Sequence, residues 1–203
     1  MKHIILLSLT FVLTAVVSSC EKEDFDHENS YERSYQIWLN FKKESDNSYT
    51  YTTESGSWTG FSTQTKITVE NGTVIGREFK YTQIGRYGIP EGGWDEATVI
   101  EAFKSKGYPD DHIEKLFEGD ILSSLQWKEG QEELGSHSSG SNIWTLDEVY
   151  KYAKDNWLIK RKNASSYFEA KNNGMISSCG YIEDGCQDDC FVGIGITSIE
   201  KRP

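Results

Sequence analysis

Three cysteines and four acidic residues lie close together in the stretch ISSCGYIEDGCQDDCFVGI, residues 176–194. Thiolates bind metals and attack electrophiles, and pairs of thiols form disulfides. The stretch could therefore be a zinc site, a catalytic site or a cross-linked hairpin. The choice depends on the compartment, because disulfides persist where conditions are oxidising, so the N-terminus has to be considered next.

The first twenty residues, MKHIILLSLTFVLTAVVSSC, indicate export. Lys2 and His3 form a short basic region, an apolar run extends over residues 4–17, and small residues follow. The run is shorter than the roughly 20 residues that a membrane-spanning helix needs. Residues 1–19 are therefore predicted to be a secretory signal peptide.

The signal ends in VVSSC, which resembles the bacterial lipobox. This resemblance implies that Cys20 is lipidated, becomes the N-terminal residue and anchors the chain to the membrane. Residues 20–29 would then be a lipidated acidic tether, similar to the tether of surface-exposed lipoproteins of the Bacteroidota. We expect an outer-membrane lipoprotein displayed at the cell surface, with a periplasm-facing anchor as the alternative.

Composition limits the remaining choices. Without residues 1–19 the chain keeps 20 Lys and Arg against 32 Asp and Glu, a net charge of −12. This acidic balance argues against nucleic acid as a partner, because phosphate contacts need basic patches. The length is sufficient for a hydrophobic core, and we expect a single domain over residues 30–203.

Two similar sets of elements are expected along the chain. In the first, apolar spacing predicts a helix over 30–44 with Ser30 as a candidate N-cap, followed by a strand over 47–55. Asn71-Gly72 then predicts a tight hairpin within 61–83. In the second, Thr145 opens a helix and forms a capping box with Glu148 three residues later. Asn173-Gly174 predicts another hairpin turn, and residues 190–200 form a final strand.

The two sets predict an α+β fold. Neither helix and neither hairpin can bury its apolar face alone, so the simplest arrangement is one antiparallel sheet of about six strands with both helices packed on one face. Each half would consist of a helix and a hairpin. Residues 84–143, which include a predicted helix over 94–107, form an inserted helical excursion between them.

The segments NSYTYTTES, ITVENGTVIG, TLDEVYKYA, NNGMISSCGY and DDCFVGIGITSIE resemble an uncharacterised bacterial lipoprotein domain family, a domain of unknown function. The resemblance covers roughly residues 30–83 and 145–200. It implies a lipoprotein with a Tyr-x-Tyr strand and Asn-Gly hairpins. It implies no activity and no catalytic residue.

Export favours a disulfide among Cys179, Cys186 and Cys190. A zinc site usually has four ligands at closer spacing, and a catalytic thiol needs an electropositive setting that these acidic surroundings do not provide. The pairing stays open, since Cys179 and Cys190 face each other if the hairpin turns near residues 184–185, whereas Cys186–Cys190 is the shorter closure. The third cysteine is free or pairs with another chain.

Four carboxylates, Glu183, Asp184, Asp188 and Asp189, are weak candidates for calcium ligands, because calcium binds several oxygens from closely spaced carboxylates. Their spacing does not follow the usual Asp-x-Asp-x-Asp-Gly pattern, and a solvated acidic turn is the alternative. No other metal and no cofactor is predicted.

No enzyme motif is present, so we expect a non-enzymatic binding or interaction module. The expected contact surface is the sheet face opposite the helices, with Trp58 or Trp94 as anchors from loops. Two alternatives remain open, an inhibitor of a secreted or envelope hydrolase and an accessory glycan-binding protein. The partner would be a protein or a glycan, in addition to the membrane itself.

Overall fold

Two Asn-Gly turns determine the predicted hairpins. The computed structural model describes residues 25–202. The asparagine and the glycine have φ angles of 48° and 77° at Asn71-Gly72, and of 52° and 89° at Asn173-Gly174. Two successive residues with positive φ form the tight turn that matches the twist of antiparallel strands, so both predicted hairpin turns are confirmed.

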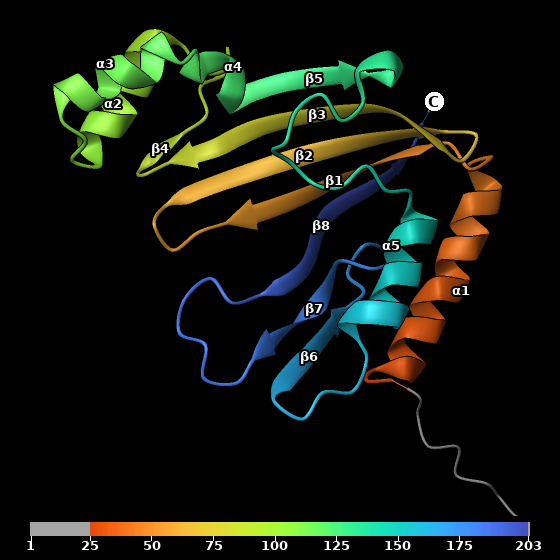
Figure 1. The fold of residues 1–203 in the computed structure, drawn as a ribbon. Coiled ribbons are helices and arrows are strands. Elements are labelled where there is room, and N and C mark those ends of the chain that lie inside the picture. Colours follow the sequence, from red (N-terminus) through yellow and green to blue (C-terminus); the bar gives the residue numbers. More distant parts are fainter. Residues whose placement is uncertain (1–24, 203) are drawn as a thin grey trace, which may run out of the picture.

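The strands form one open antiparallel sheet, with eight strands in the described part of the chain (Figure 1). They are β1 (Tyr49–Gly56), β2 (Phe61–Glu70), β3 (Thr73–Ile84), β4 (Tyr87–Gly88), β5 (Gln126–Gly130), β6 (Ala164–Glu169), β7 (Ser178–Glu183) and β8 (Val192–Lys201). Their order is β4-β3-β2-β1-β8-β7-β6, and β5 also pairs with β3. The α+β class is confirmed, but the predicted number of about six strands is too low, because β4 and β5 come from the excursion and extend the sheet.

Two helices of the main body, α1 (Glu28–Glu44) and α5 (Leu146–Tyr152), pack against the sheet, and α5 continues into a wider helical turn, η2 (Ala153–Trp157). Tyr49 of β1 connects both helices. Its ring lies 5.0 Å from that of Trp38 in α1, and its hydroxyl accepts a hydrogen bond from the N–H of Leu146 in α5. The helices and the sheet therefore share one apolar core.

The start of α5 agrees with the prediction from its residues, and the start of α1 does not. At α5, Thr145 Oγ1 accepts from the N–H of Glu148, whose carboxylate accepts from the N–H of Thr145, so the predicted capping box is confirmed. α1 instead begins at Glu28 with His27 as its N-cap, and Phe25 is already buried in the core. The folded domain thus begins before residue 30. The predicted signal peptide and Cys20 lie outside the described residues.

The excursion at 84–143 forms a helical end of the molecule (Figure 1, green). It contains α2 (Glu96–Ser105), α3 (Asp110–Glu118), α4 (Ile121–Leu125), β5 and a short 3-10 turn, η1 (Gln131–Glu133). These elements bury a second apolar cluster around Ile84, at the end of β3.

Trp94 belongs to this cluster, and its Nε1 donates to the carbonyl of Tyr81 at 2.8 Å. Trp94 is therefore not available as a surface anchor. It precedes α2 in a loop, but the helices of the excursion bury its side chain in the second core.

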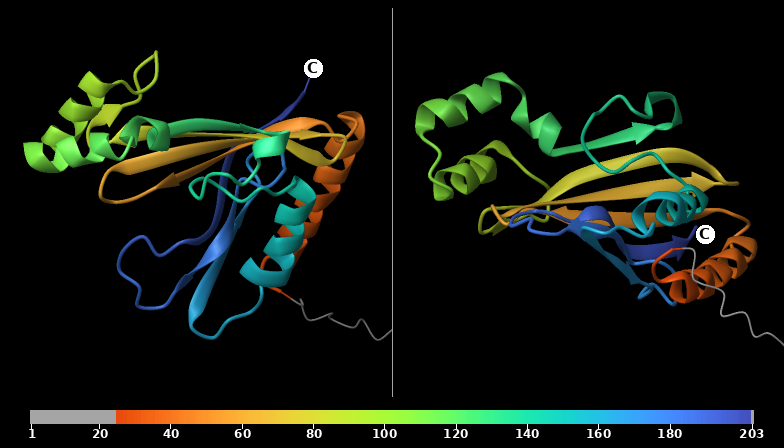
Figure 2. Two further views of the ribbon diagram at one scale, coloured as in Figure 1. Left: turned by 45° about the horizontal axis from the view of Figure 1, so that its top comes forward. Right: turned by 60° about the horizontal axis from the view of Figure 1, so that its bottom comes forward.

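β1 and β8 separate toward one end of the sheet (Figures 1 and 2). Residues 49–53 of β1 pair with residues 196–201 of β8, whereas residues 54–56 pair only with β2 and residues 192–195 pair only with β7. A register shift between Thr52 and Thr53 marks the point of separation. The two strands therefore diverge in a V, with the β1–β2 turn and the β7–β8 loop at its open end (Figures 1 and 2).

Candidate binding site between two tied loops

The disulfide joins Cys186 to Cys190 in the loop between β7 and β8, with the two Cα atoms 6.0 Å apart. The predicted disulfide is present, and of the two closures that the sequence allows the structure has the shorter one. Cys179 lies fully buried on β7 as a free thiol. Burial raises the pKa of the Cys179 thiol far above its ordinary value, so this thiol stays protonated and unreactive.

Asp189 connects the disulfide loop to the turn between β1 and β2. Its carboxylate accepts hydrogen bonds from Ser57 Oγ at 2.6 Å and from the backbone N–H of Trp58 at 3.2 Å. Asp189 has a φ of 45°, a left-handed conformation that is uncommon outside glycine. We call the turn, residues 57–60, and the loop, residues 184–191, the tied loops.

The four carboxylates considered for calcium lie at the end of β7 and in the β7–β8 loop. Glu183, Asp184 and Asp188 are exposed, and Asp189 already accepts two hydrogen bonds from the β1–β2 turn. Between residues 25 and 202, no three His, Cys, Asp or Glu side chains are grouped so that they could hold a metal ion. Within this acidic stretch Asp189 contacts the β1–β2 turn, and the arrangement of the carboxylates does not support a calcium site.

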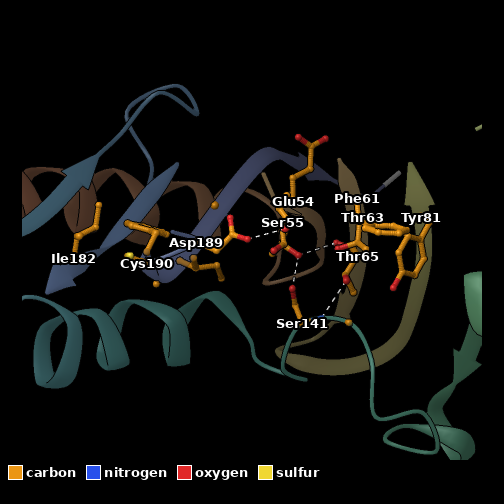
Figure 3. Close-up of a pocket in the computed structure, with 18 residues that line it drawn as sticks. Glu54, Ser55, Phe61, Thr63, Thr65, Tyr81, Ser141, Ile182, Asp189 and Cys190 are labelled. Carbon is orange, nitrogen blue, oxygen red and sulfur yellow. Dashed lines mark hydrogen bonds between the residues drawn. The ribbon is translucent and has the colours of Figure 1, made fainter. Parts of the chain in front are cut away.

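A groove of about 830 Å³ occupies the V between β1 and β8 (Figure 3). Its walls are the diverging strand ends, the tied loops and residues 140–141. Phe61 and Tyr81 line it from β2 and β3, and Phe191 lines it from the β7–β8 loop. Serine and threonine side chains also line the groove: Thr53, Ser55, Ser57, Thr63, Thr65 and Ser141.

Some of these hydroxyls are already bonded within the protein and others are not. Thr53 Oγ1 lies 2.5 Å from Ser141 Oγ, and the N–H of Ser141 donates to Thr65 Oγ1 at 3.1 Å (Figure 3). By contrast, the hydroxyls of Ser55, Thr63 and Tyr81 have no hydrogen bond to another group in residues 25–202. The groove therefore combines hydroxyls that are available to a ligand with hydroxyls that already bond to one another within the protein.

A buried ion pair positions the loop that supplies Ser141. Arg77 of β3 donates from Nε and Nη2 to the Glu129 carboxylate, at 2.9 Å each, and both side chains are almost completely buried. Glu129 also accepts from the N–H groups of Gly135 and His137, and Arg77 donates to the carbonyls of His137 and Ser141. This loop is thus fixed to the sheet by charge-assisted hydrogen bonds.

The hydrogen bonds also determine the charge state of Glu129. Burial alone raises the pKa of this carboxyl, but the bonds from Arg77, Gly135 and His137 outweigh it and hold the pKa well below its usual value. Glu129 is therefore ionised at neutral pH and compensates the buried guanidinium.

Exposed apolar side chains border the groove. Trp58 in the β1–β2 turn is 73% exposed, and Phe191 and Val192, where the β7–β8 loop meets β8, are 41% and 46% exposed. Asp189 lies two residues before Phe191 and bonds to the backbone of Trp58, so these three side chains belong to one end of the molecule. We call Trp58, Phe191 and Val192 the apolar rim. Trp58 was a predicted contact residue, whereas Phe191 and Val192 were not.

The sheet face predicted as the contact surface is polar where β2, β3 and β5 meet. Lys66 lies opposite Glu78, and Glu78 lies opposite Lys128 and pairs with it at 2.8 Å. Alternating charges of this kind are typical of a solvated face. The groove and the apolar rim lie instead where the strands diverge.

Comparisons with known proteins found no match that bears on this site. No family model matches the chain, and no curated protein or solved structure is significantly similar to it. None of the helices between residues 25 and 202 is both long and apolar enough to cross a membrane.

Proposed function

We propose that the protein is an exported lipoprotein that is anchored to the outer membrane through Cys20, is displayed at the cell surface and binds a partner without catalysing a reaction. The N-terminal signal and the lipobox-like VVSSC support the anchor. The acidic segment that follows Cys20 supports display on the outside of the cell.

The observation that carries the binding proposal is the groove together with the apolar rim. Free hydroxyls inside a concave site give specificity, and large exposed aromatic side chains beside it give contact area, as in many recognition sites. The tied loops lie on the side of the molecule away from α1, where the described chain begins (Figures 1 and 2). A membrane tether that leads into α1 would leave them accessible.

We infer a protein partner. Trp58 is the type of side chain that acts as an anchor in protein interfaces, and the exposed carboxylate of Asp188, next to Asp189 in the tied loops, complements a basic surface. Phe61 and Tyr81, which line the groove from β2 and β3, are less suited to stacking on sugars, because Nζ of Lys106 lies 4.6 Å from the centre of the Phe61 ring and the two rings pack edge-on.

A second candidate is the inhibitor of a secreted or envelope hydrolase. A disulfide and the Asp189 contacts hold the tied loops in one conformation, which lowers the entropic cost of inserting them into a cleft.

We also propose that the chain is related to the uncharacterised lipoprotein family that its Tyr-x-Tyr segment and Asn-Gly hairpins resemble. These segments are β1 and the turns of the β2–β3 and β6–β7 hairpins.

Photo-crosslinking in the bacterium that makes the protein tests the proposal. Benzoylphenylalanine in place of Trp58 or Phe191 is expected to give a discrete adduct with a partner protein on an immunoblot. The same group in place of Ile159, which is exposed and apolar but lies between η2 and β6, is the matched control and should give none.

The outcomes separate the candidates. The absence of adducts from both rim positions, or identical adducts from the rim and from position 159, would contradict protein binding at this site. A mature Cys20→Ser chain that is retained on a glycan array, and loses retention with Ser55→Trp, would instead favour the glycan-binding alternative. Inhibition of a hydrolase identified in the adduct would favour the inhibitor.

A further inference from the structure

The disulfide is placed where it can control the candidate site. Cys186 and Cys190 close a small ring that contains Asp189, and Asp189 makes the contacts to Ser57 and Trp58 across the end of the groove. One covalent bond in the β7–β8 loop therefore constrains the residue that connects the two loops.

Few backbone hydrogen bonds hold this loop in place. On the β8 side the pairing of β7 ends at Tyr181 and Val192. Beyond that point the loop backbone is held by the N–H of Asp184, which donates to Asn163, and by the N–H of Cys186, which donates to Glu183. Neither bond reaches Asp189, so its left-handed conformation is held by the ring and by the contacts of its own carboxylate with Ser57 and Trp58.

We infer that the Cys186–Cys190 bond is a redox-sensitive latch for the groove. In the oxidised protein the ring holds Asp189 against the β1–β2 turn, and in the reduced protein Asp189 is released and the tied loops separate. This inference rests on the proposed function, because the groove and the apolar rim are the site that the latch would regulate.

The chemistry needs a dithiol reductant, such as a thioredoxin-like protein of the cell envelope. One of its thiolates attacks a sulfur of the Cys186–Cys190 bond, forms a mixed disulfide and displaces the other cysteine. Its second thiol then releases the remaining cysteine. The dithiol becomes a disulfide, and its two electrons and two protons convert the protein disulfide into two thiols.

The surroundings suit a reversible reaction. Cys186 is exposed and Cys190 is half-buried, so a reductant can reach the bond. Cys179 is fully buried, which keeps it from exchanging with the disulfide. The two loop cysteines can therefore open and close without forming a different pair.

Hydrogen exchange at the Trp58 amide measures the latch directly, because this N–H donates to Asp189. In the mature Cys20→Ser chain, dithiothreitol is expected to accelerate exchange at Trp58 by about fivefold or more, as a hydrogen bond to a charged acceptor is lost. The amide of Gly72, which donates to Asn47 far from the loop, is the internal control and should not change.

Two variants isolate the cause. Asp189→Ala is expected to give fast exchange at Trp58 with the disulfide intact, whereas Asp188→Ala, its neighbour without a contact to Ser57 or Trp58, should keep the redox response. A double Cys186→Ser, Cys190→Ser variant should exchange fast at Trp58 whether or not dithiothreitol is present.

Unchanged Trp58 exchange after reduction, with both loop thiols shown to be free by labelling, would overturn the latch. A redox response that persists in Asp189→Ala would also overturn it. Neither result bears on the crosslinking test, so failure of the latch and failure of the proposed binding function are distinguishable.

Discussion

At the scale of single residues, Glu129 is expected to have a large effect on stability. Glu129→Gln leaves the buried guanidinium of Arg77 without a counter-charge, and removal of one partner of a buried pair costs about 3–5 kcal/mol. We expect the free energy of unfolding in urea to fall by that amount. Glu78→Gln is the matched control, because its pair with Lys128 is largely exposed and should contribute less than about 1 kcal/mol.

The same carboxyl predicts a pH dependence. The pKa of Glu129 in the folded protein lies below its ordinary value of 4.5. Its stabilising contribution is therefore fully present above that ordinary value and is lost as the pH falls toward the pKa of the folded state. Stability measured from pH 6 downward should decline less steeply for Glu129→Gln than for the wild type, and parallel curves would argue against this assignment.

A substitution of Cys20 tests the proposed membrane anchor. Cys20→Ala removes the thiol that the lipobox resemblance marks for acylation, so the protein should move from the membrane fraction to the soluble fraction. Cell fractionation and the mass of the N-terminal peptide measure the change. Ser19→Ala keeps a small residue before Cys20 and should remain in the membrane fraction. An unchanged distribution of Cys20→Ala would exclude this anchor.

At the scale of elements, β7 and β8 depend on a close approach of two glycines. A Cβ at Gly193 would collide with the carbonyl oxygen of Cys179, and one at Gly180 would lie 2.5 Å from that of Val192. Gly193→Ala should therefore lower the free energy of unfolding by about 1–3 kcal/mol. Gly130→Ala, with nothing within 4 Å of the added Cβ, should be near neutral, and equal effects would contradict this explanation.

Elements with local signals were predictable from the sequence. The Asn71-Gly72 turn, the Asn173-Gly174 turn and the Thr145 capping box each depend on residues within four positions of one another. The pairing of β5 with β3 was not predictable, because it joins segments about fifty residues apart. The burial of Trp94 was missed for the same reason, since its cluster forms only when the excursion folds.

The candidate site was predictable only in part. The cysteine stretch pointed to a disulfide, but the sequence could not choose between two closures that were both consistent with a hairpin. The groove exists because β1 and β8 diverge, and the apolar rim exists because Asp189 contacts Ser57, which lies 132 positions earlier in the chain. Neither feature has a local pattern, so Phe191 and Val192 could not be recognised as neighbours of Trp58.

For the whole molecule, β8 is the strand on which the fold depends. It lies between β1 and β7 and is the strand that joins the two halves of the described sheet. A chain that ends at Phe191 should therefore show no cooperative unfolding in urea. A chain that ends at Lys201, where β8 ends, is the control and should keep a cooperative transition. A cooperative transition in the shorter chain would show that each half is stable alone.

The central position of β8 also affects the order of events in the cell. Its ten residues follow both β1 and β7 in the chain, so β1 and β7 cannot be joined through β8 until the ribosome has also made β8. The signal peptide that we propose lies at the other end of the sequence and is made before the sheet can close. Under the proposed export, the chain would therefore enter the translocation machinery with its sheet still incomplete and would reach its final fold on the far side of the membrane.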